Sequence, residues 1–197
     1  MDVLVVNVGS STVKLQVVDP DGIRAFSAEL AAPVDPPALD RIIAGLGPVG
    51  AVGHRVVHGG PDHVEPELVT DGLLAGLDEV ARLAPLHDPP ALEVVRLVRR
   101  LHPELPAVVC FDTAFHATLA PSARHYAVPA EWEDRFGIRR YGFHGLNHRY
   151  VAHRAAEMLG RRVEDLKLVT CHLGAGASLA AVEGGRSVDT TMGFTPL

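Results

Sequence analysis

Residues 3–22, VLVVNVGSSTVKLQVVDPDG, decide the fold that we expect for this chain. Two apolar segments rich in β-branched residues flank the small residues GSST at 9–12, and this pattern is typical of two strands joined by a tight turn. The DPDG sequence at 19–22 is a second turn signal, after which another strand begins. The chain is therefore predicted to open with an antiparallel β-meander. The expected strands are residues 3–7, 13–18 and 23–29.

The rest of the chain alternates helix-like and strand-like patterns, which predicts an α/β fold. Apolar residues recur every three or four positions in the expected helices, and short apolar runs mark the expected strands. The expected helices are residues 39–46, 71–87, 89–103 and 146–160. Further strands are expected within residues 49–60 and 106–112, and three more within 166–194. Residues 117–145 show no regular pattern.

The segment 166–194 repeats the order of features found at the start of the chain. Aligning VVNVGSSTVKLQVVDPDG with VTCHLGAGASLAAVEGGR places Asn7 near His172 and Gly9 on Gly174. In both segments an apolar strand leads into a small-residue turn and then into a second strand. An internal duplication explains this match. A chance match of two glycine-containing hairpins is the alternative.

Composition and charge favour a globular protein with a small-molecule partner. The chain has 197 residues, of which 47% are hydrophobic, and this is enough for a sizeable core. A net charge of −6 and an aromatic content of 5% argue against a nucleic-acid surface, which is normally basic and often uses stacking rings. Cys110 and Cys171 lie in strand-like runs and are expected to be buried free thiols. We recognise no signal sequence and no membrane span, so a cytoplasmic location is predicted.

The GSST turn is a candidate phosphate site. Its backbone N–H groups, with the hydroxyls of Ser10 and Thr12, form a concavity that can bind an anion without a helix N-terminus. Lys14 adds a compact positive charge close by. A second small-residue turn, GAGAS at 174–178, recurs at the matching place. An ordinary hairpin turn chosen for its glycine and serine residues is the alternative.

Two charged residues lie at the ends of expected strands. Arg55 precedes a pair of glycines, and its planar guanidinium suits a carboxylate or a phosphoryl group. A surface salt bridge is the alternative for this residue. Asp112 ends a buried strand, where a carboxylate needs a metal ion, a proton or a hydroxyl as a partner. Helix capping is the alternative for Asp112.

Eleven histidines are many for a chain of this length, and His144, His148 and His153 lie near the start of one expected helix. Two histidines four positions apart can bind zinc, but HGLNH lacks the glutamate of a zincin helix and offers no clear third ligand. His144 can instead donate a hydrogen bond to charge that develops on a phosphoryl group.

Five stretches together resemble one family: VNVGSSTVK, GHRVVHGG, CFDTAFH, YGFHGLNHRYV, and CHLGAGASLAAV with DTTMGFTPL. The chain is similar to the acetate kinases, which belong to the superfamily of acetate and sugar kinases, Hsp70 and actin. The matches run in order from residue 3 to residue 197. The resemblance implies reversible transfer of the γ-phosphoryl group of ATP to acetate, which gives acetyl phosphate and ADP, with Mg²⁺ and an in-line displacement.

The resemblance also implies the domain organisation. A first ribonuclease H-like (actin-like ATPase) domain is expected at 1–116, and the start of a second, truncated copy at 117–197. In the family, the second catalytic arginine, the adenosine pocket, a magnesium-binding glutamate and most of the dimer interface follow this point. The 197 residues alone are therefore expected to be inactive, and the full-length form is expected to be a homodimer with no nucleic-acid or membrane partner.

The resemblance assigns roles residue by residue. The expected catalytic residues are Arg55, Asp112, His144 and His87. Acetate is expected to contact Arg55 and an apolar pocket of Val57, Leu86, Phe143 and Pro196. The expected contacts of the nucleotide phosphates are Ser10, Thr12, Lys14, His172, Gly174, Ala175 and Gly176. The expected magnesium ligands are Asn7 and, indirectly, Asp112.

Two departures from the family pattern bear on function. Ala175 replaces the asparagine that is usual in the second turn, which removes one side-chain contact to the phosphates. Leu146 and Asn147 replace the usual Thr-Ser after His144. A propionate or butyrate kinase is one alternative function, and a non-catalytic module that binds nucleotide or acyl phosphate is another.

Overall fold

The computed structural model describes residues 1–196, so Leu197, the last residue of the final matched motif, lies outside the described residues. The chain divides into two compact units. The first unit comprises Met1–Val56 and Pro66–Cys110, and the second comprises Val57–Glu65 and the described residues from Phe111 onward. The expected domain division after residue 116 stays a prediction.

A six-stranded sheet forms the centre of the first unit, with the order β3-β2-β1-β4-β6-β5. Its strands are β1 (Val3–Val8), β2 (Thr12–Val18), β3 (Arg24–Ala31), β4 (Ala51–Val56), β5 (Glu67–Leu68) and β6 (Ala107–Phe111). β1 pairs antiparallel with β2, and β2 pairs antiparallel with β3, so the predicted opening meander is confirmed. β4 runs parallel to β1. The two-residue strand β5 was not predicted, because it is too short to show an alternating pattern.

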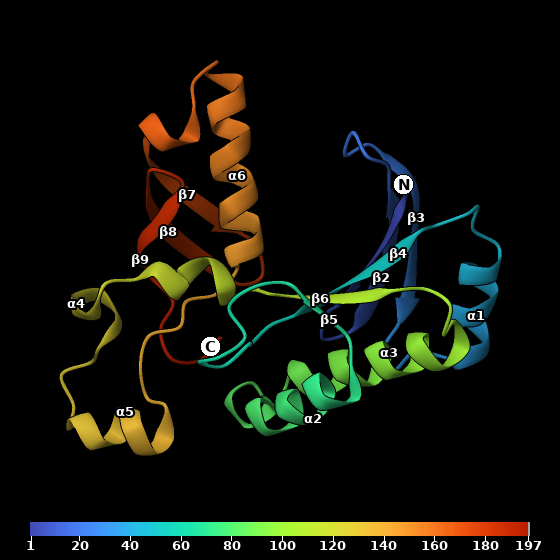
Figure 1. Ribbon diagram of the computed structural model, residues 1–197, viewed down its shortest axis with the longest axis horizontal. Coiled ribbons are helices and arrows are strands. Elements are labelled where there is room, and N and C mark those ends of the chain that lie inside the picture. Colours follow the sequence, from blue (N-terminus) through green and yellow to red (C-terminus); the bar gives the residue numbers. More distant parts are fainter. Residues whose placement is uncertain (197) are drawn as a thin grey trace. The chain divides into compact units, whose positions relative to one another are not determined.

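Helices cover one face of this sheet (Figure 1). The helices of the first unit are α1 (Pro36–Ala44), α2 (Asp71–Val80) and α3 (Asp88–Leu101). Alternate residues of β1, such as Leu4 and Val6, pack with Leu39 of α1 and Val94 of α3 in one core. Because successive strand residues point to opposite faces, the residues between them face away from these helices. This alternation places Asn7 on the face of the sheet opposite to the core.

The second unit contains a three-stranded antiparallel sheet of β7 (Lys167–Leu173), β8 (Ala177–Glu183) and β9 (Arg186–Thr190). The long helix α6 (Gly145–Met158) matches the predicted helix. Two short helices, α4 (Pro121–Arg124) and α5 (Ala130–Phe136), lie in the stretch for which we predicted no regular structure. Helices of four and seven residues are too short to show a helical period, which explains why they were missed.

The two three-stranded meanders share the features that suggested an internal repeat. Each begins with two antiparallel strands joined by a small-residue turn, and the backbone closes each turn. Gly9 N donates to Thr12 O at 2.8 Å, and Gly174 N donates to Gly176 O at 3.0 Å. The third strand is antiparallel to the second in both cases, with an irregular register at one point. The topology therefore agrees with a duplicated unit.

The thiols and the surface charges add detail to the predictions from composition. Cys110 and Cys171 form no disulfide, but Cys110 is only half-buried and Cys171 is exposed, so the prediction that both are buried was wrong. Cys171 departs from it most. Cys171 faces outward because Thr170 occupies the buried position of the alternating strand β7.

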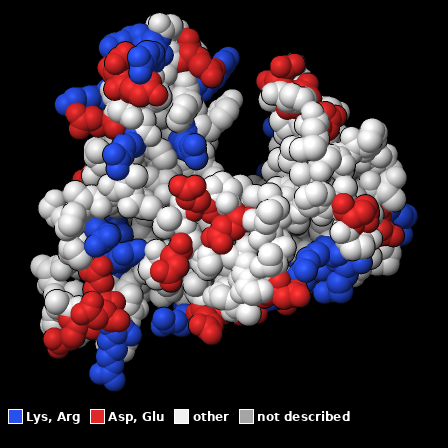
Figure 2. All heavy atoms as spheres, in the orientation of Figure 1, with Lys and Arg blue, Asp and Glu red and all other residues white. Residues whose placement is uncertain are grey.

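On the face shown in Figure 2, basic side chains stand in small groups among acidic and uncharged ones. Among residues 1–196, no helix has the length and apolar character that a membrane span requires.

Four histidines are buried to at least 98%: His54, His58, His116 and His148. Burial is the largest cause that lowers the pKa of each ring from the usual 6.5 to about 4. His54 shows this effect most simply, because burial is its one cause and its Nε2 atom has no hydrogen-bond partner. The folded chain therefore holds these rings in the neutral form at pH values where the unfolded chain protonates them.

We predict that the free energy of unfolding is insensitive to these rings above about pH 7 and decreases between pH 6.5 and 4. Within that window the unfolded state binds more protons than the folded state, so acidification favours unfolding by about 1.4 kcal/mol per pH unit for each ring. Denaturant titrations across this range measure the slope. His54→Leu should reduce the slope, and His153→Leu, at an exposed position, should leave it unchanged. Equal slopes for both variants would contradict this account.

A close backbone approach within the second unit joins the start of α6 to Asp112, the residue that follows β6. Gly145 N donates to Asp112 O at 2.9 Å, and a Cβ atom on Gly145 would lie only 2.2 Å from that oxygen. The same Cβ atom would lie 2.8 Å from the Cβ atom of Phe115. Only glycine fits here without displacing the backbone that carries Asp112.

We predict that Gly145→Ala destabilises the chain by about 1–3 kcal/mol, the usual cost of forcing an extra methyl group into packed structure. Gly72→Ala is the matched control, because Gly72 also lies in the first turn of a helix but has only a side-chain oxygen at 3.9 Å. Helix propensity alone should leave that control unchanged or up to about 1 kcal/mol more stable. Chemical denaturation of both variants gives the comparison, and equal effects would exclude the close approach as the cause.

Candidate active site

Three polar residues lie side by side on the sheet of the first unit, on the face away from the core. Asn7 of β1 is paired in register with Lys14 of β2 on one side and with Arg55 of β4 on the other. Arg55 Nη1 donates to Asn7 Oδ1 at 3.1 Å, and Arg55 is half-buried. The pairing of three strands therefore gathers an amide, an ammonium group and a guanidinium, which together suit an anionic ligand.

The GSST turn lies beside these residues, because it connects β1 to β2. Ser10 is exposed and Thr12 is half-buried, so both hydroxyls lie near the surface of the first unit. The carbonyl oxygen of Ser11 accepts from Ala32 N at 2.9 Å, which ties the turn to the end of β3. The predicted phosphate-binding residues of the first unit are thus contiguous in the structure.

Asp112 directly follows β6 and is only 2% exposed. Its charge raises the pKa of both His116 and His148, although burial lowers each of these pKa values more strongly. The predicted acid is therefore close to the histidines of the second unit. A carboxylate in this position must be held by polar partners, as the sequence suggested.

His144 is the N-cap residue of α6 and adopts the left-handed conformation, with φ of 58° and ψ of 21°. Among residues 1–196, it is the one residue other than glycine with a positive φ. Such a conformation costs about 1–3 kcal/mol and is concentrated at functional sites. The ring of His144 stacks on that of His172, with centroids 3.9 Å apart and an interplanar angle of 14°.

The small-residue turn of the second unit lies next to these two rings. A Cβ atom on Gly176 would lie 3.3 Å from Nε2 of His144, and one on Gly174 would lie 3.6 Å from Nε2 of His172. Residues 174–176 are all exposed. The structure therefore brings His144, His172 and the second turn together, and the Nε2 atoms of both rings lie beside the turn.

A chain of hydrogen bonds extends from His144 into the core of the second unit. His144 Nδ1 lies 2.8 Å from Ser178 Oγ, which lies 2.9 Å from His148 Nε2. His148 Nδ1 in turn lies 2.8 Å from Thr170 Oγ1. Sequence reasoning missed Ser178 and Thr170, and it considered His148 only as a metal ligand. The spacing of four between His144 and His148 was the available signal, because it places both on one side of a helix.

The two departures from the family pattern have different structural consequences. Asn147 Oδ1 lies 3.1 Å from His172 Nδ1, so this residue gives His172 a hydrogen-bond partner. Leu146 is exposed and makes no polar contribution. Ala175 lies exposed in the turn and offers no side-chain donor.

The remaining predicted site residues fall in both units. His87 is the half-buried N-cap residue of α3 in the first unit, next to Leu86, which is 70% exposed. Val57 and Phe143 are buried in the second unit, and Pro196 is half-buried there. The predicted acetate pocket of these apolar residues stays a prediction.

Zinc binding by the histidine cluster finds no geometric support in the described part of the chain. Residues 1–196 contain no group of three or more His, Cys, Asp or Glu side chains placed to hold a metal ion. His153 is exposed and bonds to the Arg149 carbonyl of its own helix at 2.9 Å.

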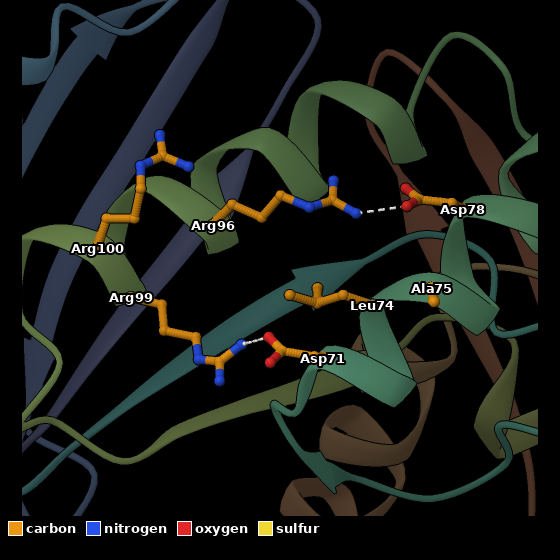
Figure 3. Close-up of a pocket in the computed structure, with 7 residues that line it drawn as sticks. All are labelled: Asp71, Leu74, Ala75, Asp78, Arg96, Arg99 and Arg100. Carbon is orange, nitrogen blue, oxygen red and sulfur yellow. Dashed lines mark hydrogen bonds and ion pairs between the residues drawn. The ribbon is translucent and has the colours of Figure 1, made fainter.

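A pocket of about 460 Å³ between α2 and α3 is lined by none of the predicted site residues (Figure 3). Arg96 donates to Asp78 at 2.6 Å and Arg99 donates to Asp71 at 2.5 Å, as the dashed lines show. Both aspartates are largely exposed, at 55% and 93% of their side-chain surface. These exposed ion pairs link two helices and contribute little energy.

Several curated relatives of this chain are named acetate kinase. The chain is 53% identical to an acetate kinase of Bacillus cereus over 156 residues, which are 79% of this chain and 39% of the relative. It is 51% identical to an acetate kinase of Shouchella clausii over the same number of residues, which are 40% of that protein. The chain thus spans about two fifths of the length of these curated relatives.

Solved structures of an acetate kinase and a propionate kinase are also similar to this chain. An acetate kinase of Porphyromonas gingivalis matches 99% of this chain with a TM-score of 0.87 and 34% identity, and 58% of that protein is covered. A propionate kinase of Francisella tularensis matches with a TM-score of 0.89 and 32% identity, and with the same coverage. The chain therefore has the actin-like ATPase fold of these kinases. The model of the acetokinase family matches residues 38–197. The chain therefore belongs to the acetokinase family.

Proposed function

We propose that this chain supplies one part of the active site of an ATP-dependent acetate kinase, which forms acetyl phosphate and ADP and acts as a homodimer in the cytoplasm. The observation that carries the proposal is the row of Lys14, Asn7 and Arg55 across three neighbouring strands, with the GSST turn at its end. Membership of the acetokinase family suggests phosphoryl transfer from ATP to acetate. These residues supply the positive charge and the hydrogen-bond donors that this reaction needs. Transfer of a phosphoryl group depends on positioning and on neutralising negative charge.

Each residue has a distinct task in this proposal. Arg55 binds the acetate carboxylate and the transferring phosphoryl group, and Asn7 holds its guanidinium in place. Lys14 and the hydroxyls of Ser10 and Thr12 bind phosphate oxygens, Thr12 in place of the serine that is usual in the family. His144 donates to the phosphoryl oxygens as charge builds up, with His87 in a supporting role. Val57, Leu86, Phe143 and Pro196 are the apolar residues that we assign to the acetate methyl group.

Magnesium fits the oxygen donors of this chain. Mg²⁺ is usually held by one or two carboxylates together with phosphate oxygens and water, so a cage made entirely of protein ligands is not required. Asn7 of the first unit offers an amide oxygen, which has a lone pair besides the one that accepts from Arg55, and the buried carboxylate of Asp112 in the second unit acts indirectly in this proposal. When bound, Mg²⁺ neutralises the charge on the phosphates.

In the second unit, His172 and residues 174–176 of the second small-residue turn bind the nucleotide phosphates in this proposal.

A propionate kinase is the second candidate function, since a propionate kinase has a closely similar structure. An apolar pocket separates acids that differ by one methylene group by only about 1–3 kcal/mol. Propionate should therefore be used, but less well than acetate. A module that binds nucleotide without catalysis would instead bind ATP and show no turnover.

The experiment is a hydroxamate assay for acetyl phosphate with acetate, propionate and butyrate. It uses the 197-residue chain and a chimera in which this chain replaces the matching segment of the Bacillus cereus acetate kinase. We expect turnover on acetate by the chimera. The chain alone should bind nucleotide weakly and show little turnover, because the relatives use more than twice its length. A folded chimera that binds ATP but forms no acyl phosphate would refute the proposed function.

We predict that Arg55→Ala in the chimera lowers kcat/KM for acetate by at least about a hundredfold, which corresponds to several kcal/mol of lost charge stabilisation. Steady-state kinetics provide the measurement. Arg24→Ala is the matched control, because Arg24 also lies on a strand of this sheet but is exposed. Activity of Arg55→Ala within tenfold of the parent would remove Arg55 from the site.

We predict that Ala175→Asn tightens ATP binding by about 0.5–1.5 kcal/mol, the net value of one added hydrogen bond. Ala175→Leu controls for side-chain size, because leucine is close to asparagine in shape but has no amide group. Titration calorimetry with ATP measures both variants. If the two substitutions change the Kd equally, the amide group is not responsible.

A further inference from the structure

We propose that Ser178, His148 and Thr170 are positioning residues that hold the proton of neutral His144 on Nδ1, which leaves Nε2 as the nitrogen that faces the phosphate turn. These three side chains do not need to touch a ligand to have this effect. They act through a continuous line of hydrogen bonds that ends at a backbone carbonyl. The role of Nε2 toward a phosphoryl group rests on the proposed function, whereas the position of the proton does not.

The line of hydrogen bonds is buried and continuous. Its three contacts, from His144 to Ser178, from Ser178 to His148 and from His148 to Thr170, measure 2.8, 2.9 and 2.8 Å. Ser178, His148 and Thr170 are exposed by 1%, 0% and 3%. Bulk water therefore has little access to these groups, and each must find its donors and acceptors among its neighbours.

The backbone carbonyl of Ala180 gives the line a direction. Thr170 Oγ1 lies 3.4 Å from Ala180 O, and because a carbonyl oxygen only accepts, the hydroxyl proton must point toward it. The hydroxyl oxygen of Thr170 is then the acceptor for His148, so Nδ1 of His148 carries the proton. Burial lowers the pKa of His148 to about 4, so near neutral pH this ring has a single proton.

The remaining donors and acceptors follow by elimination. With its proton on Nδ1, His148 has a lone pair on Nε2, and Ser178 must donate its hydroxyl proton there. The oxygen of Ser178 is then the acceptor for His144, so Nδ1 of His144 is the donor. Nε2 of neutral His144 is left with a lone pair beside Gly176.

This arrangement has a consequence for phosphoryl transfer. A proton that arrives on His144 can bind only at Nε2, and the imidazolium then donates from Nε2 toward an anion at the turn. Its other N–H group stays committed to Ser178, which keeps the ring in one orientation. Free histidine prefers the other neutral tautomer, with the proton on Nε2, so the protein has to impose this one.

The neighbouring imidazole rings of His172 and His116 make their hydrogen bonds to other groups. His172 stacks on the face of the His144 ring, and its own Nδ1 bonds to Asn147. His116 bonds to Ser187 at 2.8 Å and to the Phe143 carbonyl at 3.0 Å. Ser178 Oγ, at 2.8 Å from Nδ1, is the group that sets the His144 tautomer in this proposal.

Nitrogen-15 NMR of the histidine side chains in the 197-residue chain tests the proposal directly, because protonated and unprotonated ring nitrogens have different chemical shifts. The spectra are recorded at neutral pH without nucleotide. We expect both His144 and His148 to carry the proton on Nδ1. A parent chain in which His144 carries it mainly on Nε2 overturns the proposal, whatever the variants show.

Thr170→Val is the decisive variant, because it removes the hydroxyl while keeping the shape of the side chain and does not alter a residue in contact with His144. The ratio of the two His144 tautomers should shift toward Nε2–H by about tenfold, the effect of about one net hydrogen bond. Thr170→Ser, which restores the hydroxyl, should return the ratio to that of the parent. An unchanged ratio in Thr170→Val overturns the proposal.

Ser187→Ala is the matched control, because it removes another buried serine hydroxyl that bonds to a histidine, but that histidine is His116. The His144 ratio should not change. Amide spectra show whether each variant is folded. If Thr170→Val does not fold, Ser178→Ala tests the same shift in the His144 tautomer ratio. The tautomer measurement needs no turnover, so its failure is distinct from failure of the kinase assay. In the chimera, Ser178→Ala should lower kcat about tenfold with little change in KM.

Discussion

The pairing of β1 with strands on both sides is the constraint on which the first unit depends. β2 lies antiparallel on one side of β1 and β4 lies parallel on the other. Because Leu4 and Val6 must face the core, Asn7 must face the opposite side. The two registers then set Lys14 and Arg55 beside it. A slip of one residue in either pairing would send these charged groups into the core, so the hydrophobic pattern that stabilises the fold also assembles the polar row.

The second unit uses close packing and buried polar groups rather than strand register. Gly145 lets α6 begin directly against the backbone of Asp112, so the acid and the strained His144 are held by the same contact. Behind His144, the interior contains His148, Ser178 and Thr170 instead of apolar side chains. Buried polar groups are costly unless they are satisfied, and here each one has a partner in the same line of hydrogen bonds. Because these buried groups must satisfy one another's hydrogen bonds, they also fix the orientation of the His144 ring.

The two halves of the proposed chemistry resemble each other in construction. Each has a three-stranded antiparallel meander whose first turn consists of small residues and is closed by a backbone hydrogen bond. In the first unit, Asn7 stands just before that turn, and in the second unit His172 does. The same scaffold thus presents an amide beside two cations in one unit and a stacked pair of imidazoles in the other. The side chains at the strand ends, rather than the fold, distinguish the two proposed phosphate-binding regions.

The sequence alone determined the meander, the main helices, the position of Asp112 at a strand end and the family, because these features depend on short-range hydrophobic periods, turn residues and motifs. It could not reveal β5, α4 and α5, which are too short to show a period. It also could not show that Cys171 faces outward or that Ser178 lies between His144 and His148. Those facts depend on strand register and on contacts between residues 22 to 34 positions apart in sequence. Only the tertiary structure decides such contacts, because they form when separate elements pack together.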